Sequence, residues 1–142
     1  MPEMSTTPDR HELVRRSLEA AGLGDVEGAI GVYTPDGVWD MSLLGVGTFV
    51  GQSAIRGFFE DWWGAYESFA NELREFVEIG PEITLAVVEQ WGRPRGSSGE
   101  VRLLYAAVGV WEDAEVVHAT LYTDIDEARV AAARLVEQRA DG

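Results

Sequence analysis

Residues 53–80 read SAIRGFFEDWWGAYESFANELREFVEIG, and the hydrophobic period changes within them from that of a helix to that of a strand. In the first part, apolar residues recur at i, i+3, i+4, i+7, i+8 and i+11, which predicts an amphipathic helix with Ser53 as its N-cap. From Phe69 onward the pattern is typical of a strand. The helical set is Ile55, Phe58, Phe59, Trp62, Trp63 and Tyr66.

Four consecutive strands are predicted after this change of period. The connections between them are short and rich in turn residues, so neighbouring strands are expected to be antiparallel. A final helix is predicted over 124–138, where Asp124 and Glu127 have the spacing of a capping box. The predicted strands are Phe69–Ile79, Ile83–Trp91, Val101–Trp111 and Val116–Thr123.

Two helices and a turn are predicted before residue 37. Thr7–Pro8 suits a helix start, and helical spacing then continues from about Asp9 to the glycines at 22 and 24. Asp25 can cap a shorter helix that runs toward Tyr33. The sequence TPDG at 34–37 is typical of a turn. A strand is expected next, and the glycine-rich LLGVGTFVG (43–51) is interpreted as a loop and a short strand.

This order of elements predicts an α+β protein in which helices lie against one face of a curved antiparallel sheet. The 142 residues form one domain, with residues 1–8 expected to be a disordered tail. With 46% hydrophobic and 25% charged residues, the composition is that of a soluble globular protein, and the absence of a targeting segment makes the cytoplasm the default location.

The charge and composition exclude several classes of partner. A net charge of −14 repels phosphate backbones and anionic lipid, so neither nucleic acid nor a membrane surface is expected as a partner. The chain has no cysteine and only two histidines, so no metal site and no cofactor are expected.

The strand VRLLYAAVGVW (101–111) is apolar on both of its faces. Antiparallel strands with one wet face alternate with polar residues, so this strand is expected to be covered on both sides. Helices would cover one face, and a second copy of the chain is the simplest cover for the other. The sequence therefore predicts a homodimer through the sheet.

The strand residues GVWDMS (37–42) contain one residue that is unusual in a strand. Asp40 lies between Trp39 and Met41, and a carboxylate is costly to bury without a partner. It is either a hydrogen-bond acceptor from a neighbouring strand or loop, or a general base whose pKa is raised by an apolar pocket.

Three segments, GDVEGAIGVYTPDGVWDMS (24–42), GTFVGQSAIRGFFEDWW (47–63) and VVHATLYTDIDEA (116–128), resemble the SnoaL-like branch of the nuclear transport factor 2-like superfamily. The resemblance covers nearly the whole chain. It implies a cystatin-like cone, in which the curved sheet wraps around the N-terminal helices, the fold that ketosteroid isomerase also has. It places the isomerase's base on Asp40 and turns that residue's face into the cone. The isomerase's tyrosine and second acid fall near Ser17 and Ala107, so steroid isomerisation is not expected, and Leu121 replaces an aspartate of limonene epoxide hydrolase.

Further candidate residues follow from the predicted inward positions. His118 could complete an acid–base pair with Asp40, and Tyr105 could donate a hydrogen bond to a developing oxyanion. Arg93 could pair with Asp40, bind an anionic substrate, or be a solvated hairpin residue. Aromatic residues expected to bind the substrate or form the wall of the pocket are Trp39, Phe59, Trp62, Trp63, Tyr66, Trp91 and Tyr122.

Two functions remain open from the sequence. The first is a cofactor-independent acid–base enzyme, such as an isomerase, cyclase or hydratase, acting on a small apolar molecule through Asp40, with His118 or Tyr105 polarising an oxygen. The second is a non-catalytic ligand-binding or dimerisation module of the same fold. A pocket of several hundred Å3 that contains Asp40 would favour the enzyme (typical ligand sites span roughly 300–1,000 Å3). A cone filled by aromatic side chains would favour the module.

Overall fold

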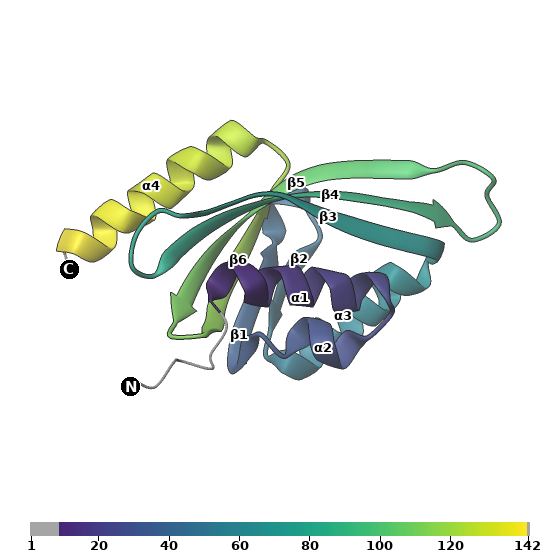
Figure 1. The fold of residues 1–142 in the computed structure, drawn as a ribbon, viewed down its shortest axis with the longest axis horizontal. Helices are drawn as coiled ribbons and strands as arrows, with labels where there is room; N and C mark the ends of the chain where they lie inside the picture. Colours follow the sequence, from purple (N-terminus) through teal and green to yellow (C-terminus); the bar gives the residue numbers. More distant parts are fainter. Residues whose placement is uncertain (1–8, 142) are drawn as a thin grey trace, which may run out of the picture.

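The computed structural model describes residues 9–141. The tail predicted over 1–8 and the helix start predicted at Thr7–Pro8 lie outside these residues. Within them, six strands form one curved sheet in the order β2-β1-β6-β5-β4-β3 (Figure 1). The strands are β1 (Tyr33–Met41), β2 (Gly47–Val50), β3 (Tyr66–Glu78), β4 (Ile83–Pro94), β5 (Val101–Glu112) and β6 (Glu115–Tyr122).

The predicted α+β cone fold is confirmed, and the sheet differs from the expected one in a single pair of strands. The strands β3 to β6 are joined by short turns and pair antiparallel, whereas β1 and β6 pair parallel. These two strands are distant in sequence, so no hairpin restricts their relative direction. The sheet is therefore mixed.

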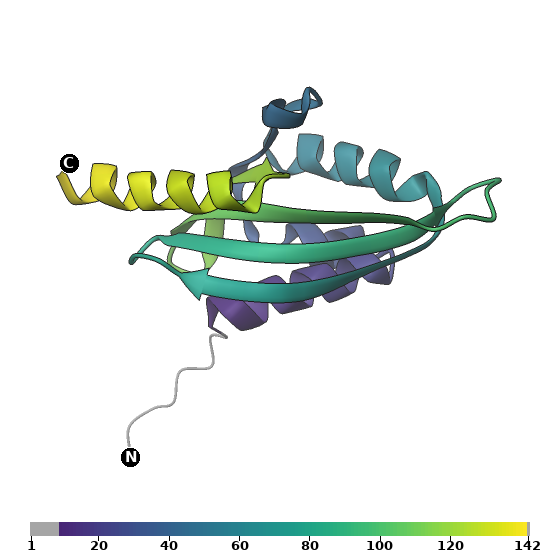
Figure 2. The ribbon, with the colours of Figure 1, turned by 90° about the horizontal axis from the view of Figure 1, so that it is seen from above.

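Helices cover both faces of the sheet (Figures 1 and 2). Three of them, α1 (Arg10–Gly22), α2 (Val26–Ile30) and α3 (Gln52–Gly64), lie on the concave side. The fourth, α4 (Ile125–Asp141), crosses the convex side of β4 and β5. The concave side therefore holds the space that the cone fold encloses.

Aspartates begin three of these helices. The side chains of Asp9, Asp25 and Asp124 accept hydrogen bonds from backbone N–H groups three residues later, at 2.8, 3.0 and 3.1 Å. The predicted cap of α3 at Ser53 is wrong, because Gly51 holds the N-cap position with φ 91°, a conformation that favours glycine.

Pairing between strands corrects two local predictions, one for a turn and one for the end of a helix. Residues 34–37 do not separate a helix from a strand; they lie within β1, where the register against β6 shifts between Tyr33 and Val38. Tyr66 does not continue α3, because the helix ends at Gly64 and Tyr66 pairs with Pro94 at the start of β3.

A second apolar core lies between the sheet and α4. Leu85, Val87, Ala106 and Val108 of the convex face pack with the fully buried Ala128 and Ala132 of α4. The face for which a second subunit was expected is thus covered here by a helix of the same chain. Val101 and Leu104, nearer the start of β5, remain exposed. The homodimer stays a prediction.

Gly109 gives a direct test of the packing on the concave face. A Cβ at this position would lie 2.9 Å from Thr84 Oγ1 and 3.1 Å from Trp111 Nε1, two atoms that are joined by a 2.8 Å hydrogen bond. We expect Gly109→Ala to lower the unfolding free energy by about 1–3 kcal/mol through overpacking. Urea denaturation measures the change.

Gly57→Ala is the matched control. An added Cβ at Gly57 in α3 meets nothing within 4 Å, so the same substitution should raise stability by about 0.5–1 kcal/mol through helix propensity. Equal effects of the two substitutions would contradict the packing described for Gly109.

Candidate functional site: an aromatic cavity inside the cone

A cavity of about 100 Å3 lies between the concave face of the sheet and the helices α1 to α3. It is smaller than typical ligand sites, which span roughly 300–1,000 Å3, because aromatic side chains fill much of the cone. Its lining comes from every strand except β2 and consists of Val14, Ser17, Leu18, Ala21, Ala29, Val32, Tyr33, Trp39, Phe59, Trp62, Trp63, Phe69, Asn71, Thr84, Ala86, Val88, Gln90, Tyr105, Ala107, Gly109, Trp111, Val116 and Ala119.

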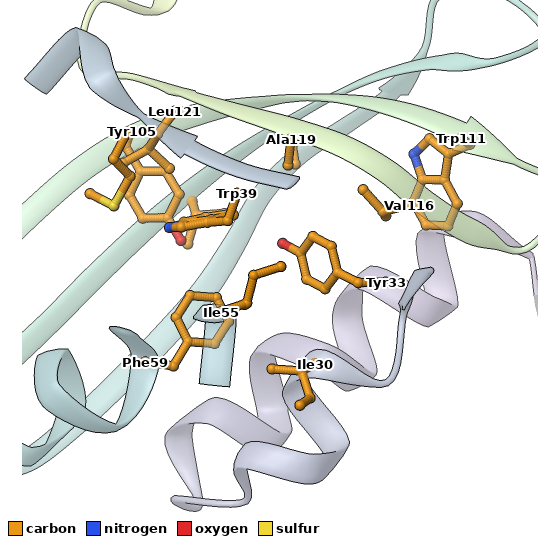
Figure 3. Packing of buried hydrophobic residues seen from close by; sticks show 13 residues of the cluster. Ile30, Tyr33, Trp39, Ile55, Phe59, Tyr105, Trp111, Val116, Ala119 and Leu121 are labelled. Atoms are coloured by element: carbon orange, nitrogen blue, oxygen red, sulfur yellow. The ribbon is translucent and has the colours of Figure 1, made fainter. Parts of the chain in front are cut away.

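Helix α3 supplies the densest part of the aromatic wall. Phe59 and Trp63 are four residues apart, so they lie on one helix face, and their rings stack at 4.7 Å. The Trp39 ring packs edge-on against Phe59 at 5.3 Å and against Tyr33 at 6.4 Å (Figure 3). Trp62 also lines the cavity. Trp39, Phe59, Trp62 and Trp63 therefore lie where a ligand would be held, and substrate binding by them stays a prediction.

Strand alternation sets which strand residues reach the cavity. On β4 and β5 the lining residues occur at every second position, at 84, 86, 88 and 90 and at 105, 107, 109 and 111. On β1 the inward side chains include Trp39, and Met41 is buried with it. Tyr105 is inward as predicted, and its role stays a prediction.

Three buried polar atoms of cavity-lining residues have no hydrogen-bond partner within residues 9–141. They are Trp39 Nε1, Asn71 Oδ1 and Gln90 Oε1. By contrast, the buried Trp111 Nε1 donates to Thr84 Oγ1 at 2.8 Å. An unpaired buried polar group costs about 1–3 kcal/mol, so these three atoms are a feature of the site that needs an explanation.

The cavity holds no strong acid or base. Its lining, as far as residues 9–141 provide it, includes no carboxylate, imidazole or basic side chain. Burial raises the pKa of the Tyr105 hydroxyl, and burial together with the nearby Tyr105 raises the pKa of Tyr33. Both tyrosines therefore stay protonated at neutral pH and can donate hydrogen bonds.

Asp40 lies on the opposite face of the sheet, and its expected inward position is wrong. Trp39 and Met41 are buried on the concave side, so Asp40 between them faces the convex side. Its neighbours there are Thr48 on β2 and Thr120 on β6. The resemblance had placed this residue on the inward face of its strand.

Hydrogen bonds hold the Asp40 carboxylate. Its Oδ1 accepts from the Ser42 backbone N–H at 2.9 Å and from the Thr48 hydroxyl at 3.1 Å. Hydrogen bonding from Ser42 is the largest of the effects that lower the pKa of Asp40, and burial opposes it. A base used near neutral pH needs a raised pKa instead.

His118 accompanies Asp40 on the convex face. Its Nε2 lies 3.9 Å from Asp40 Oδ2, and its Nδ1 lies 3.3 Å from the Thr120 hydroxyl. The predicted pairing of His118 with Asp40 is thus present in space, but outside the cavity. The sequence correctly put these two residues on one face and chose the wrong side of the sheet for both.

The remaining sequence-predicted residues also lie away from the cavity. Tyr122 follows the outward parity of His118 and lines a surface groove beside α4. Trp91 lies on the convex face beneath the guanidinium of Arg102, whose Cζ is 5.8 Å from the ring centroid. Arg93 forms an ion pair with Glu67 at 3.1 Å and not with Asp40. Tyr66 packs beside Phe69 at 5.6 Å outside the lining.

Tyr33, Asn71 and Gln90 were missed by the sequence interpretation. Asn71 and Gln90 sit directly opposite each other on β3 and β4. The signal that identifies them is a polar amide on a largely apolar strand face, and this signal can be recognised only once the concave face of each strand is known.

Within residues 9–141 no group of three or more His, Asp or Glu side chains is arranged to hold a metal ion. No helix in this part of the chain is long and apolar enough to cross a membrane.

The sheet, the helices inside its curve and the cavity between them define a nuclear transport factor 2-like cone protein. The family model of the SnoaL-like domain matches residues 14–135, and the chain therefore belongs to the SnoaL-like family. No curated protein sequence matches the chain.

Solved structures share the fold at low sequence identity. TerC co-crystallized with polyporic acid is 20% identical, with 90% of this chain and 98% of that chain covered and a TM-score of 0.69. A ketosteroid isomerase-like fold protein from Catenulispora acidiphila, in complex with trimethylamine, is 15% identical (90% and 95% covered, TM-score 0.71). An NTF2-like protein of unknown function from Burkholderia pseudomallei is 23% identical (87% and 95% covered, TM-score 0.69).

The hydrogen bonds of Asp40 predict a pH-dependent contribution to stability. Because its folded pKa is lowered, ionised Asp40 stabilises the fold above its unfolded pKa of about 3.9, and this stability is lost as pH falls through the lower folded value. We expect Asp40→Asn to lower the unfolding free energy at pH 7 by about 1 kcal/mol.

Denaturant unfolding of both proteins between pH 3 and pH 7 measures this difference. It should shrink below about pH 4. A difference that keeps its size down to pH 3 would contradict the hydrogen-bonded carboxylate described here.

Proposed function

We propose that this protein binds a small, largely apolar molecule, about one ring in size, within the cone. The observation that supports this most directly is the cavity itself, an aromatic-walled space of about 100 Å3. Ligand pockets are typically apolar concavities with a few polar groups that fix orientation. Apolar cavities of about 150 Å3 accept benzene, so a single ring suits this space better than a fused polycycle.

Binding without acid–base catalysis is the better-supported of the two functions left open by the sequence. A general base must be within hydrogen-bond reach of the proton it removes. Asp40 and His118 lie across the sheet from the cavity, and Tyr105 is held protonated by burial. The isomerase, cyclase or hydratase reaction predicted from Asp40 is therefore the alternative that a turnover assay must test.

Two solved structures with this fold were obtained with small molecules. TerC was crystallized with polyporic acid, and the Catenulispora protein was crystallized with trimethylamine. Both resemble the present chain at identities of 20% or less, which supports the fold and not a shared ligand.

Filling the cavity tests the proposed function. Ala107 lines the cavity and lies on the concave face of β5, so Ala107→Leu places new side-chain volume in the space a ligand would occupy. We expect it to weaken the binding of benzene and of phenol at least tenfold, as measured by isothermal titration calorimetry.

Ala54→Leu is the matched control, because Ala54 is exposed on α3 and the same substitution there should leave binding unchanged. Asp40→Asn should also leave the affinity for both probes unchanged, because Asp40 lies on the opposite face of the sheet. Equal binding by Ala107→Leu and the unsubstituted protein, or no binding of either probe by the latter, would overturn the proposal. Turnover abolished by Asp40→Asn would restore the acid–base enzyme.

A further inference from the structure

We propose that the molecule bound in the cavity is an uncharged ring that carries a hydroxyl group, recognised by the amides of Asn71 and Gln90 and by the indole N–H of Trp39. This inference rests on the proposed function and deepens it, because it assigns the chemical class of the ligand. The three unpaired polar atoms carry it.

Asn71 and Gln90 form one polar patch in a largely apolar wall. They are direct cross-strand partners on β3 and β4, so side chains on the same face of this pair lie within contact distance of each other. Asn71 Nδ2 donates to the Leu18 carbonyl at 3.4 Å, which leaves Asn71 Oδ1 unpaired. Gln90 is 3% exposed and its Oε1 is also unpaired. Two carbonyl oxygens on neighbouring side chains therefore lack a hydrogen-bond donor.

Trp39 supplies the complementary group. Its Nε1–H can only donate, it is buried, and it has no acceptor within the described residues. Figure 3 shows the Trp39 indole above Phe59 and beside Tyr33, and the indole packs edge-on against both rings. A hydroxyl group both donates and accepts, so a ligand hydroxyl can pair with an amide oxygen and with a donor of the wall.

The electrostatics of the cavity favour an uncharged ligand. The lining provided by residues 9–141 offers no basic side chain to an anion and no carboxylate to a cation, and a buried charge without a partner is strongly unfavourable. The net charge of −14 also repels anions before they reach the cavity. A neutral ring with a hydroxyl group suits the apolar wall, and its hydroxyl can donate to one of the two amide oxygens while it accepts from the Trp39 N–H.

A panel of four probes of similar size tests this inference by calorimetry: phenol, benzene, benzoate and benzylammonium. We expect phenol to bind the unsubstituted protein at least tenfold more tightly than benzene, since a site built to hydrogen-bond a hydroxyl discriminates against the analogue that lacks it. Benzoate and benzylammonium should bind more weakly than phenol.

Gln90→Met removes the amide while keeping a similar length. It should reduce the preference for phenol over benzene severalfold or more, because phenol loses a hydrogen-bond partner while benzene keeps an apolar contact at this position. Gln138→Met, on the exposed side of α4, is the matched control and should keep the full preference. Should Gln90→Met not fold, Asn71→Leu makes the same test from the other strand.

The outcomes separate the two proposals. Equal affinities for phenol and benzene would overturn the proposal that the ligand carries a hydroxyl group, but not the proposal that the cavity binds a ligand. The unpaired polar atoms would then be hydrogen-bonded to water. If benzoate or benzylammonium bound most tightly, the proposal that the ligand is uncharged would be overturned. A preference for phenol that survives both substitutions would overturn the assignment to the amides. Failure of all four probes to bind would contradict the proposed function itself, and with it the proposed chemical class of the ligand.

Discussion

The alternation of side chains along β1 is the constraint on which the site depends. Consecutive strand residues face opposite sides of a sheet, so the chain cannot send both Trp39 and Asp40 into the cone. Trp39 faces inward and is 6% exposed, and it packs against both Phe59 of α3 and Tyr33. A shift of one residue would bury a carboxylate among aromatic rings and expose an indole, which is unfavourable on both counts.

The same alternation separates two environments on the two faces of the sheet. The concave face holds aromatic side chains, two protonated tyrosines and a few amides around a small cavity. The convex face holds the hydrogen-bonded Asp40 with His118 near it, and farther along β4 and β5 the core beneath α4. Acid–base groups and apolar enclosure, which an acid–base enzyme of this fold would combine, are therefore kept apart in this chain.

Much of the fold follows from the sequence because periodicity is a local property. The helices of 9–24 and 124–138, the brief helix after Asp25 and the four strands from β3 to β6 were all readable from spacing and caps. The parallel pairing of β1 with β6 was not, since it joins residues about eighty positions apart, such as Val38 and His118. The bulge that absorbs residues 34–37 into β1 likewise arises from pairing with a distant strand.

The site was less predictable, because it depends on which face of each strand is concave. The pairing of Asp40 with His118 on one face was predicted, but a single sequence does not say which face is inside. The α3 aromatics were found from their helical spacing, and Tyr105 was placed inward by the resemblance. Asn71 and Gln90 are ordinary strand residues in the sequence, and only their shared position opposite each other marks them out.

The most direct test of where a ligand binds is a proton–nitrogen NMR titration of the isotope-labelled protein with phenol. This account predicts that the Trp39 indole N–H resonance and the side-chain amide of Gln90 shift with ligand concentration, while the backbone amides of Asp40 and His118 stay in place. Shifts concentrated at Asp40 and His118, with the Trp39 indole unmoved, would contradict it.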